Sequence, residues 1–183
     1  MSNGLCVFSA ALVLAAGPAL AAGDCAKLCD AEFYASATPA FLQELIDAGV
    51  DVNARDAVGK TPLHWAAGAT PEVISALLAA GADVHAKDQY DRTPLHFVSA
   101  TGSAENIRLL VDAGADVNAR TANDWTPLHG LASFGAPENV AVLLEAGADA
   151  AARNEMGESA FDLARSNPRM ADSDALMILE DAQ

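Results

Sequence analysis

A four-residue segment, Thr-Pro-Leu-His, occurs three times in this chain of 183 residues. The copies span residues 61–64, 93–96 and 126–129, so successive copies begin 32 and 33 residues apart. Each copy is followed by Gly-Ala-Asp, at residues 81–83, 114–116 and 147–149. A period near 33 residues predicts a repeat protein, in which each unit stacks only on its neighbours. Such a scaffold presents an extended binding face rather than an enclosed catalytic pocket.

Each period reads as a helix, a turn, a second helix and a loop. In the first copy, the Thr61 hydroxyl can cap a helix and Pro62 takes the first helical position, where its missing N–H costs nothing. Pro71 begins a second helix in the same way, and Gly81 follows it, where a left-handed residue ends a helix. Apolar residues at helical spacing predict one buried face on this second helix. Because one pair cannot bury both of its sides, the units must stack and the end units must be polar caps.

The repeat register divides the chain into units. Three complete repeats span residues 56–87, 88–120 and 121–153. An incomplete unit at 25–55 precedes them, and a shorter, altered unit at 154–183 follows them. We therefore expect one domain over residues 22–183. Acidic residues near the C-terminus are expected to give the last unit a polar outer side.

The three Thr-Pro-Leu-His copies, taken with Gly-Ala-Asp, resemble the ankyrin-repeat family over about residues 30–183. The resemblance implies an all-α solenoid of stacked helix-turn-helix units with finger loops. It implies that other proteins bind at the finger tips and on the exposed side of each first helix. It also implies that His64, His96 and His129 form hydrogen bonds between neighbouring loops, rather than acting as catalysts or metal ligands.

The positions at which the repeats differ are the candidate binding residues. Mapped by register onto the fingers and first helices, they are Val58, Lys60, Tyr90, Arg92, Trp125, Phe134 and Met156. Aromatic side chains and Arg are the residue types that most often anchor protein interfaces. The alternative, that Trp125 or Phe134 covers an adjacent loop, stays open. Trp65 and Phe97 directly follow the motif His and are expected in the core between units.

Two fingers depart from the repeat pattern. Gly59 and Gly157 are replaced in the middle fingers by Asp91 and Asp124. Gly supplies a positive φ at this position, and Asp tolerates it at some cost. Since the same two fingers carry most of the candidate residues, we expect them to be the recognition centre.

The charge balance bears on the partner. Lys and Arg number 10 against 25 Asp and Glu, a net charge of −15. This argues against nucleic acid and anionic membrane surfaces, both of which attract basic proteins. Solubility alone accounts for such a charge, and a partner with a basic surface is the alternative.

The N-terminus predicts export. An apolar, uncharged run at residues 5–16 precedes Pro18 and an Ala-Leu-Ala segment at 19–21. This pattern indicates a signal peptide at residues 1–21, which places the mature protein in the periplasm or outside the cell, without a membrane attachment. No Lys or Arg stands in the first four residues, and an uncleaved anchor is the alternative.

Cleavage would leave two cysteines, Cys25 and Cys29. In an exported protein such a pair favours a disulfide, with a redox pair or metal ligands as alternatives.

The sequence contains no recognisable catalytic, metal-binding or nucleotide-binding motif. It contains no nucleophile elbow, zinc-binding HExxH, P-loop or dinucleotide fingerprint. We therefore expect no enzyme activity, cofactor or metal, but a monomer that binds another protein and modulates or protects it. A secreted effector that binds a host protein is the alternative, and an enzyme or metal-binding protein is a remote one.

Overall fold

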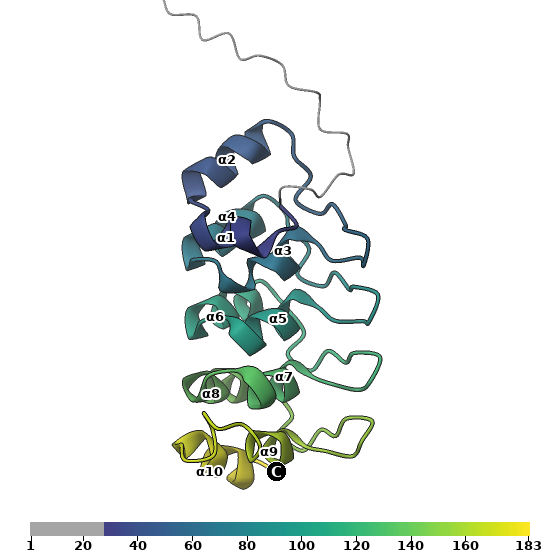
Figure 1. Ribbon diagram of the computed structural model, residues 1–183, viewed down its shortest axis with the longest axis vertical. Helices are drawn as coiled ribbons and strands as arrows, with labels where there is room; N and C mark the ends of the chain where they lie inside the picture. Colours follow the sequence, from purple (N-terminus) through teal and green to yellow (C-terminus); the bar gives the residue numbers. More distant parts are fainter. Residues whose placement is uncertain (1–27) are drawn as a thin grey trace, which may run out of the picture.

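Helix pairs stack in chain order along the long axis of the molecule, and a finger loop projects from the same side of each middle pair (Figure 1). The computed structural model describes residues 28–183, and these form helices and turns without a strand. The expected all-α solenoid is confirmed. The expected signal peptide at residues 1–21 and Cys25 lie outside the described residues.

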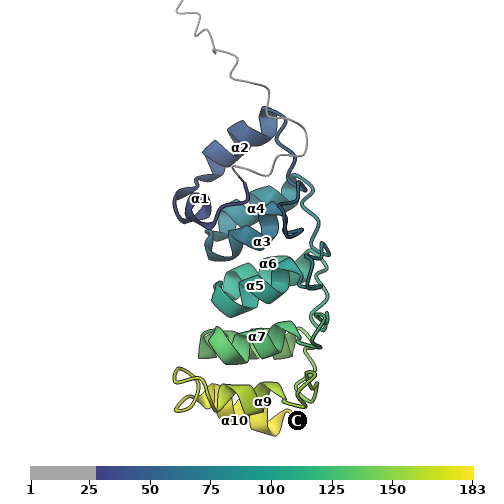
Figure 2. The same cartoon turned by 45° about the vertical axis from the view of Figure 1, so that its right-hand side comes forward.

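First helices and second helices form two layers, and Figure 2 shows α5 and α7 in front of the second helices of their units. The first helices are α1 (Ala31–Ser36), α3 (Pro62–Trp65, continued by a 3₁₀ turn at Ala66–Gly68), α5 (Pro94–Thr101), α7 (Pro127–Phe134) and α9 (Ala160–Ala164). The second helices are α2 (Pro39–Asp47), α4 (Pro71–Ala79), α6 (Ala104–Asp112), α8 (Val140–Glu145, preceded by a 3₁₀ turn at Pro137–Asn139) and α10 (Asp174–Asp181).

The predicted helix boundaries follow local backbone chemistry. Proline is the first residue of α2, α3, α4, α5 and α7. The glycines after the second helices have φ between +85° and +93°, the left-handed region in which a side chain is strained: Gly49, Gly81, Gly114 and Gly147. The motif leucines Leu63, Leu95 and Leu128 are fully buried between units. Burying such a side chain contributes roughly 1.5–3 kcal/mol.

The motif histidines connect each unit to the next. The Nε2 atoms of His64, His96 and His129 lie 3.0, 3.2 and 3.1 Å from the carbonyl oxygens of Arg92, Trp125 and Glu158. Each Nδ1 accepts a hydrogen bond from the backbone N–H of the motif threonine, at 3.0 or 3.1 Å. An Nδ1 that accepts must be unprotonated, so each ring is neutral and donates through Nε2. The brace that the family resemblance implied is confirmed.

Burial lowers the pKa of all three motif histidines, and that of His96 to about 4. The backbone carbonyl at Nε2 acts in the opposite direction in each case but does not outweigh burial.

A second set of cross-unit hydrogen bonds comes from buried asparagines that lie outside the repeated motifs. The Nδ2 atoms of Asn106, Asn139 and Asn167 donate to the carbonyl oxygens of Ala69, Gly102 and Ala132, at 2.9, 3.0 and 3.0 Å. Each bond ties a residue near the second helix to the end of the preceding unit's first helix. It satisfies a helix-terminal carbonyl that lacks an intrahelical partner.

A third set of cross-unit bonds is interrupted in the middle of the stack. Asn53 donates to the carbonyl oxygen of Gly81 and accepts from the N–H of Asp83, both at 2.8 Å. Asn118 makes the equivalent pair with Gly147 and Asp149, at 3.0 and 2.8 Å. His85 occupies this position between the two and is exposed.

Replacing His85 with Asn should therefore complete this set. We expect the free energy of unfolding to rise by about 1 kcal/mol, the net contribution of an exposed pair of hydrogen bonds. Guanidinium unfolding at pH 7.5, where the motif histidines are neutral, measures the change. The matched control, Asn118→His, should lower stability by a similar amount. Equal stability of His85→Asn and the natural chain would contradict the expectation.

The end units hold the stack in different ways. At the N-terminus, buried Tyr34 donates its hydroxyl to the carbonyl oxygen of Leu28 at 3.0 Å, and burial raises its pKa. The Cys29 Sγ lies 3.7 Å from the carbonyl oxygen of Lys60. At the C-terminus, Met170 is fully buried, whereas Met177 and Ile178 on α10 are exposed. The expectation of a polar outer side for this unit is thus wrong in part, because a helix with five successive apolar residues cannot bury all of them against one neighbour.

Candidate functional site

The first residue of each finger folds the finger onto itself. Asp56 Oδ1 accepts hydrogen bonds from the N–H groups of Val58 and Lys60, both at 2.9 Å. Asp88 does the same for Tyr90 and Arg92, at 2.9 and 3.0 Å. In the next two fingers, Thr121 and Asn154 accept from the equivalent N–H groups. The last residue of every finger is therefore held in a defined place beside the first helix.

The two middle fingers adopt the backbone that the sequence predicted. Asp91 and Asp124 both have φ of +59°, where Gly59 and Gly157 have +80° and +79°. Each aspartate also forms an exposed ion pair within its finger, with Lys87 at 3.6 Å and with Arg120 at 3.3 Å.

Neighbouring fingers are hydrogen-bonded to one another. The N–H groups of Gln89, Ala122 and Glu155 donate to the carbonyl oxygens of Val58, Tyr90 and Asn123, at 2.9, 3.0 and 3.1 Å. The finger tips therefore form one continuous edge rather than four independent loops.

Cations and aromatic rings alternate where the fingers meet the first helices. The Lys60 Nζ lies 4.2 Å from the ring centroid of Trp65 and 4.5 Å from that of Phe97. The Arg92 Cζ lies 4.7 Å from the centroid of Phe97 and 4.8 Å from that of Tyr90.

Trp65 and Phe97 were expected in the core, and this expectation is confirmed in part. Both are half-buried and pack against the core, and the Phe97 ring lies 5.6 Å from the His64 ring of the preceding unit. Their other side faces the finger cations, and the Trp65 indole also donates to Asp56 Oδ2 at 3.0 Å.

Arg92 is fixed by an ion pair with a buried carboxylate. Its Nε and one terminal nitrogen lie 2.8 and 2.7 Å from Asp88 Oδ2, and the Asp88 side chain is fully buried. Burial raises the pKa of this carboxyl, but the hydrogen bonds from Arg92 and from two backbone N–H groups outweigh it and hold the pKa below its ordinary value. Removing Arg92 would leave a buried charge without its partner, so Arg92 stabilises the finger as well as facing the solvent.

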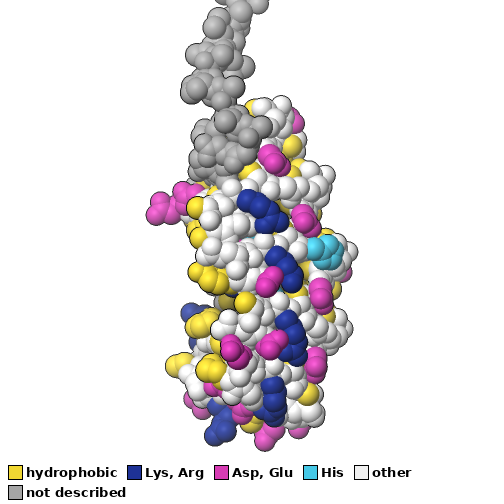
Figure 3. Space-filling view, turned by 90° about the vertical axis from the view of Figure 1, so that its right-hand side faces the viewer, with side chains coloured by type: hydrophobic (Ala, Val, Ile, Leu, Met, Phe, Trp, Pro, Cys, Tyr) yellow, Lys and Arg dark blue, Asp and Glu magenta, His cyan; other side chains and the backbone are white. Residues whose placement is uncertain are grey.

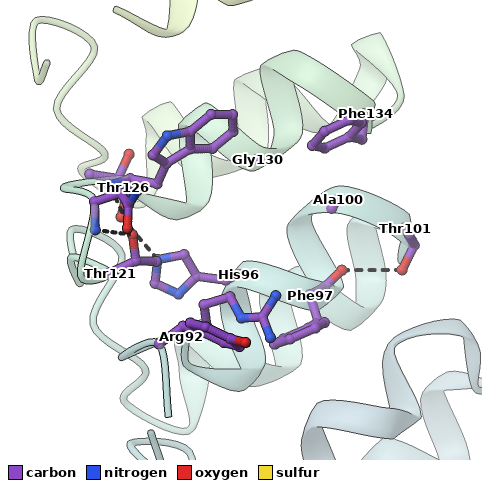
Figure 4. Close-up of a pocket in the computed structure, with 12 residues that line it drawn as sticks. Arg92, His96, Phe97, Ala100, Thr101, Thr121, Thr126, Gly130 and Phe134 are labelled. Atoms are coloured by element: carbon purple, nitrogen blue, oxygen red, sulfur yellow. Dashed lines mark hydrogen bonds between the residues drawn. The ribbon is translucent and has the colours of Figure 1, made fainter. Parts of the chain in front are cut away.

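A cavity of about 420 Å³ lies between the middle fingers and the helices α5 and α7 (Figure 4). Its lining includes four of the seven candidate residues, Tyr90, Arg92, Trp125 and Phe134. Lys60 lines a second cavity of about 340 Å³, beneath α1, whereas Val58 and Met156 line neither. Gly130 also lines the first cavity, at the register position of Trp65 and Phe97. Gly130 was not among the residues predicted from the sequence, although the repeats, aligned at that position, show that a side chain is missing there.

A family model described as ankyrin repeats (3 copies) matches residues 31–121 and 68–154 of this chain. The chain belongs to the ankyrin-repeat family. Ankyrin repeats are generally protein–protein interaction modules and are typically non-catalytic. No match was found among the curated proteins.

The candidate residues differ in how far this ankyrin scaffold exposes them. Tyr90, Phe134 and Met156 are 51%, 65% and 71% exposed. Val58, Lys60, Arg92 and Trp125 are half-buried. The Trp125 ring lies 6.0 Å from the His129 ring, so Trp125 packs on its own unit and also faces the cavity.

The outer edge of the ankyrin fingers is less acidic than the chain as a whole. Figure 3 shows a column of basic side chains down this face, flanked by acidic ones. Exposed basic residues recur at the base of each finger: Arg55, Lys87, Arg120 and Arg153. Arg55 and Arg120 donate to the carbonyl oxygens of Lys87 and Arg153, at 2.7 and 3.1 Å, so they also join neighbouring units.

Two further features of the described residues bear on other classes of function. Among residues 28–183, no three His, Cys, Asp or Glu side chains lie close enough together to hold a metal ion. Within the same residues, no helix is both long and apolar enough to span a membrane.

Proposed function

We propose that this chain is a monomeric ankyrin module that binds another protein in the periplasm or outside the cell, and that it modulates or protects this partner. One observation carries the proposal: Tyr90, Arg92, Trp125 and Phe134 surround one cavity on the finger side of the stack. Side chains of these types dominate the energetics of protein interfaces when they cluster around a pocket.

The partner's surface is proposed to be basic. The net charge of −15 supports this, because a strong field of one sign accelerates association with an oppositely charged protein. Because the finger edge carries the basic column, a basic partner would contact the acidic side chains beside that column and on the helices. An association rate that falls steeply with added salt would support this part of the proposal.

Export is proposed from the apolar leader at residues 1–21, and a Cys25–Cys29 disulfide would tie down the N-terminal unit after cleavage. A secreted effector that binds a host protein is the second candidate. Affinity purification of the tagged chain from periplasmic extract and from culture supernatant, followed by mass spectrometry, separates the two. A partner in the periplasm supports the first candidate, and presence of the chain in the supernatant alone supports the second.

Three exposed apolar side chains provide the sharpest test of the binding face. Replacing Tyr90, Phe134 and Met156 together with Ser should weaken capture of the partner at least about 100-fold, because each is an exposed anchor of the interface. Surface plasmon resonance with the purified partner measures the change. The helical circular dichroism and the melting temperature should stay unchanged, because none of the three is buried.

Phe41→Ser is the matched control, since Phe41 is 44% exposed on α2 and lies away from the fingers. It should leave binding unchanged. Unchanged capture by the triple variant, or an equal loss in the control, would overturn the assignment of the binding face.

A further inference from the structure

The residue directly after the motif His determines how many aromatic rings the first helices place around each cation on the finger side. In the first complete repeat the finger ends in Lys60, whose ammonium lies between two rings. Trp65 belongs to the same unit and Phe97 to the next, and both directly follow the motif His. Two successive units thus each supply one aromatic ring to the cation between them.

The next unit repeats only part of this arrangement. Arg92 takes the register position of Lys60, and its guanidinium carbon lies 4.7 Å from the Phe97 centroid and 4.8 Å from that of Tyr90, which belongs to the same finger and not to the next first helix. The following unit has Gly130 where the second ring would stand, and it contributes no side chain. The cavity of about 420 Å³ occupies this place, and in Figure 4 Arg92 and Phe97 lie across it from Gly130 and Phe134.

The chemistry of the lining selects the kind of group that fits. Arg92 is already paired with the buried Asp88, so an anionic ligand would have to compete with that carboxylate. A cationic group would be repelled by the guanidinium. An aliphatic side chain could fill the space but would gain no cation–π attraction. A planar aromatic ring gains apolar contact with Trp125 and Phe134. Its attraction to the guanidinium adds to the contacts that Arg92 already makes with Tyr90 and Phe97.

We propose that this cavity receives one aromatic side chain of the protein partner, which takes the place of the ring that Gly130 lacks. The inference rests on the proposed function, because it assigns the ring to a protein partner. Gly130 is then a specificity-determining residue: it leaves open a site that the preceding units fill with their own side chains.

The chain can be made to fill the site itself. A Cβ added at Gly130 meets only the carbonyl oxygen of His96, at 3.5 Å, an ordinary contact. Gly130→Phe should therefore fold, and its melting temperature should rise because a glycine inside α7 is replaced and apolar surface is covered. The same variant should lose the partner, so that a gain in stability accompanies a loss of binding.

The test uses a short aromatic peptide as probe. Acetyl-Ala-Trp-Ala-amide is titrated into the ¹⁵N-labelled chain, and ¹H–¹⁵N spectra are recorded. The chain has two tryptophans, so the Trp65 indole signal serves as an internal control for that of Trp125. We expect saturable shifts of the Trp125 indole and the Gly130 amide at millimolar peptide. The Ala-Leu-Ala peptide should bind about five- to tenfold more weakly, and Gly130→Phe should abolish the shifts.

Ala79→Phe, which adds a ring on α4 in the other helix layer, should bind the peptide like the natural chain. Absence of saturable shifts, equal affinity for the leucine peptide, or unchanged binding by a folded Gly130→Phe would each overturn the inference. If Gly130→Phe captures the protein partner as well as the natural chain does, the cavity assignment fails and the binding function stands. If the peptide binds but no partner is captured, the function fails and the cavity assignment stands.

Discussion

Lowering the pH from 7 toward 4 should progressively unfold this protein, with His96 alone costing up to about 3 kcal/mol of stability. The folded chain holds the pKa of His96 at about 4, and those of His64 and His129 below their ordinary value, because burial disfavours the charged ring. In the unfolded chain each histidine titrates near 6.5. At a pH between the folded and unfolded pKa values, the unfolded chain binds more protons at these histidines than the folded chain does. Stability is therefore fully present above about pH 6.5 and is lost as the pH falls through this window, by up to about 1.4 kcal/mol per pH unit for each ring.

Guanidinium unfolding at pH 7.5, 6 and 5 measures this effect. A protonated Nδ1 cannot accept the hydrogen bond from the threonine N–H, so protonation of each ring also breaks the bond that caps the first helix of its unit. The variant His96→Gln should be less stable at pH 7.5 and should show a shallower pH dependence. A free energy of unfolding that stays constant between pH 7.5 and 5 would contradict the neutral, buried state of the three rings.

The substitution Gly102→Ala should lower the free energy of unfolding by about 3 kcal/mol, at the upper end of what overpacking costs. A Cβ at this position would lie 2.7 Å from the carbonyl oxygen of Val98 and 2.9 Å from that of Ala67. The first of these atoms belongs to the same helix, α5, and cannot yield without distorting its last turn. The second belongs to the preceding unit and cannot yield without moving the stacked units apart. The cost is steric, since the φ of Gly102 is an ordinary −86°.

Gly68→Ala is the matched control for this substitution. Gly68 is exposed at the end of the equivalent helix one unit earlier, and an added Cβ meets nothing within 4 Å. Its stability should therefore stay within about 0.5 kcal/mol of the natural chain. A Gly102→Ala protein as stable as Gly68→Ala would show that the units can move apart at little cost.

Several features of the fold could be predicted because their causes are local. The Thr-Pro pairs, the left-handed glycines and the positive φ of Asp91 and Asp124 all depend on one or two residues and their own backbone. The histidine brace was implied by the family resemblance and confirmed by the contacts of His64, His96 and His129.

Other features could not be predicted from the sequence because they depend on pairs of distant residues. The buried amides are an example, since Asn106 and Ala69 are 37 residues apart in the chain. The orientation of Trp65 and Phe97 is another. Both follow a buried motif and pack against the core, yet one side of each ring faces a finger cation and leaves the ring only half-buried.

The sequence by itself determined where most helices begin and end and that the units repeat and stack, because capping residues, prolines and glycines act on the backbone within a few residues. The tertiary structure alone decided that Arg92 is bound by a buried carboxylate and that Gly130 leaves a cavity beside it. The size of a cavity depends on the distances between side chains of different units. No single repeat contains those distances, so they exist only once the units are stacked.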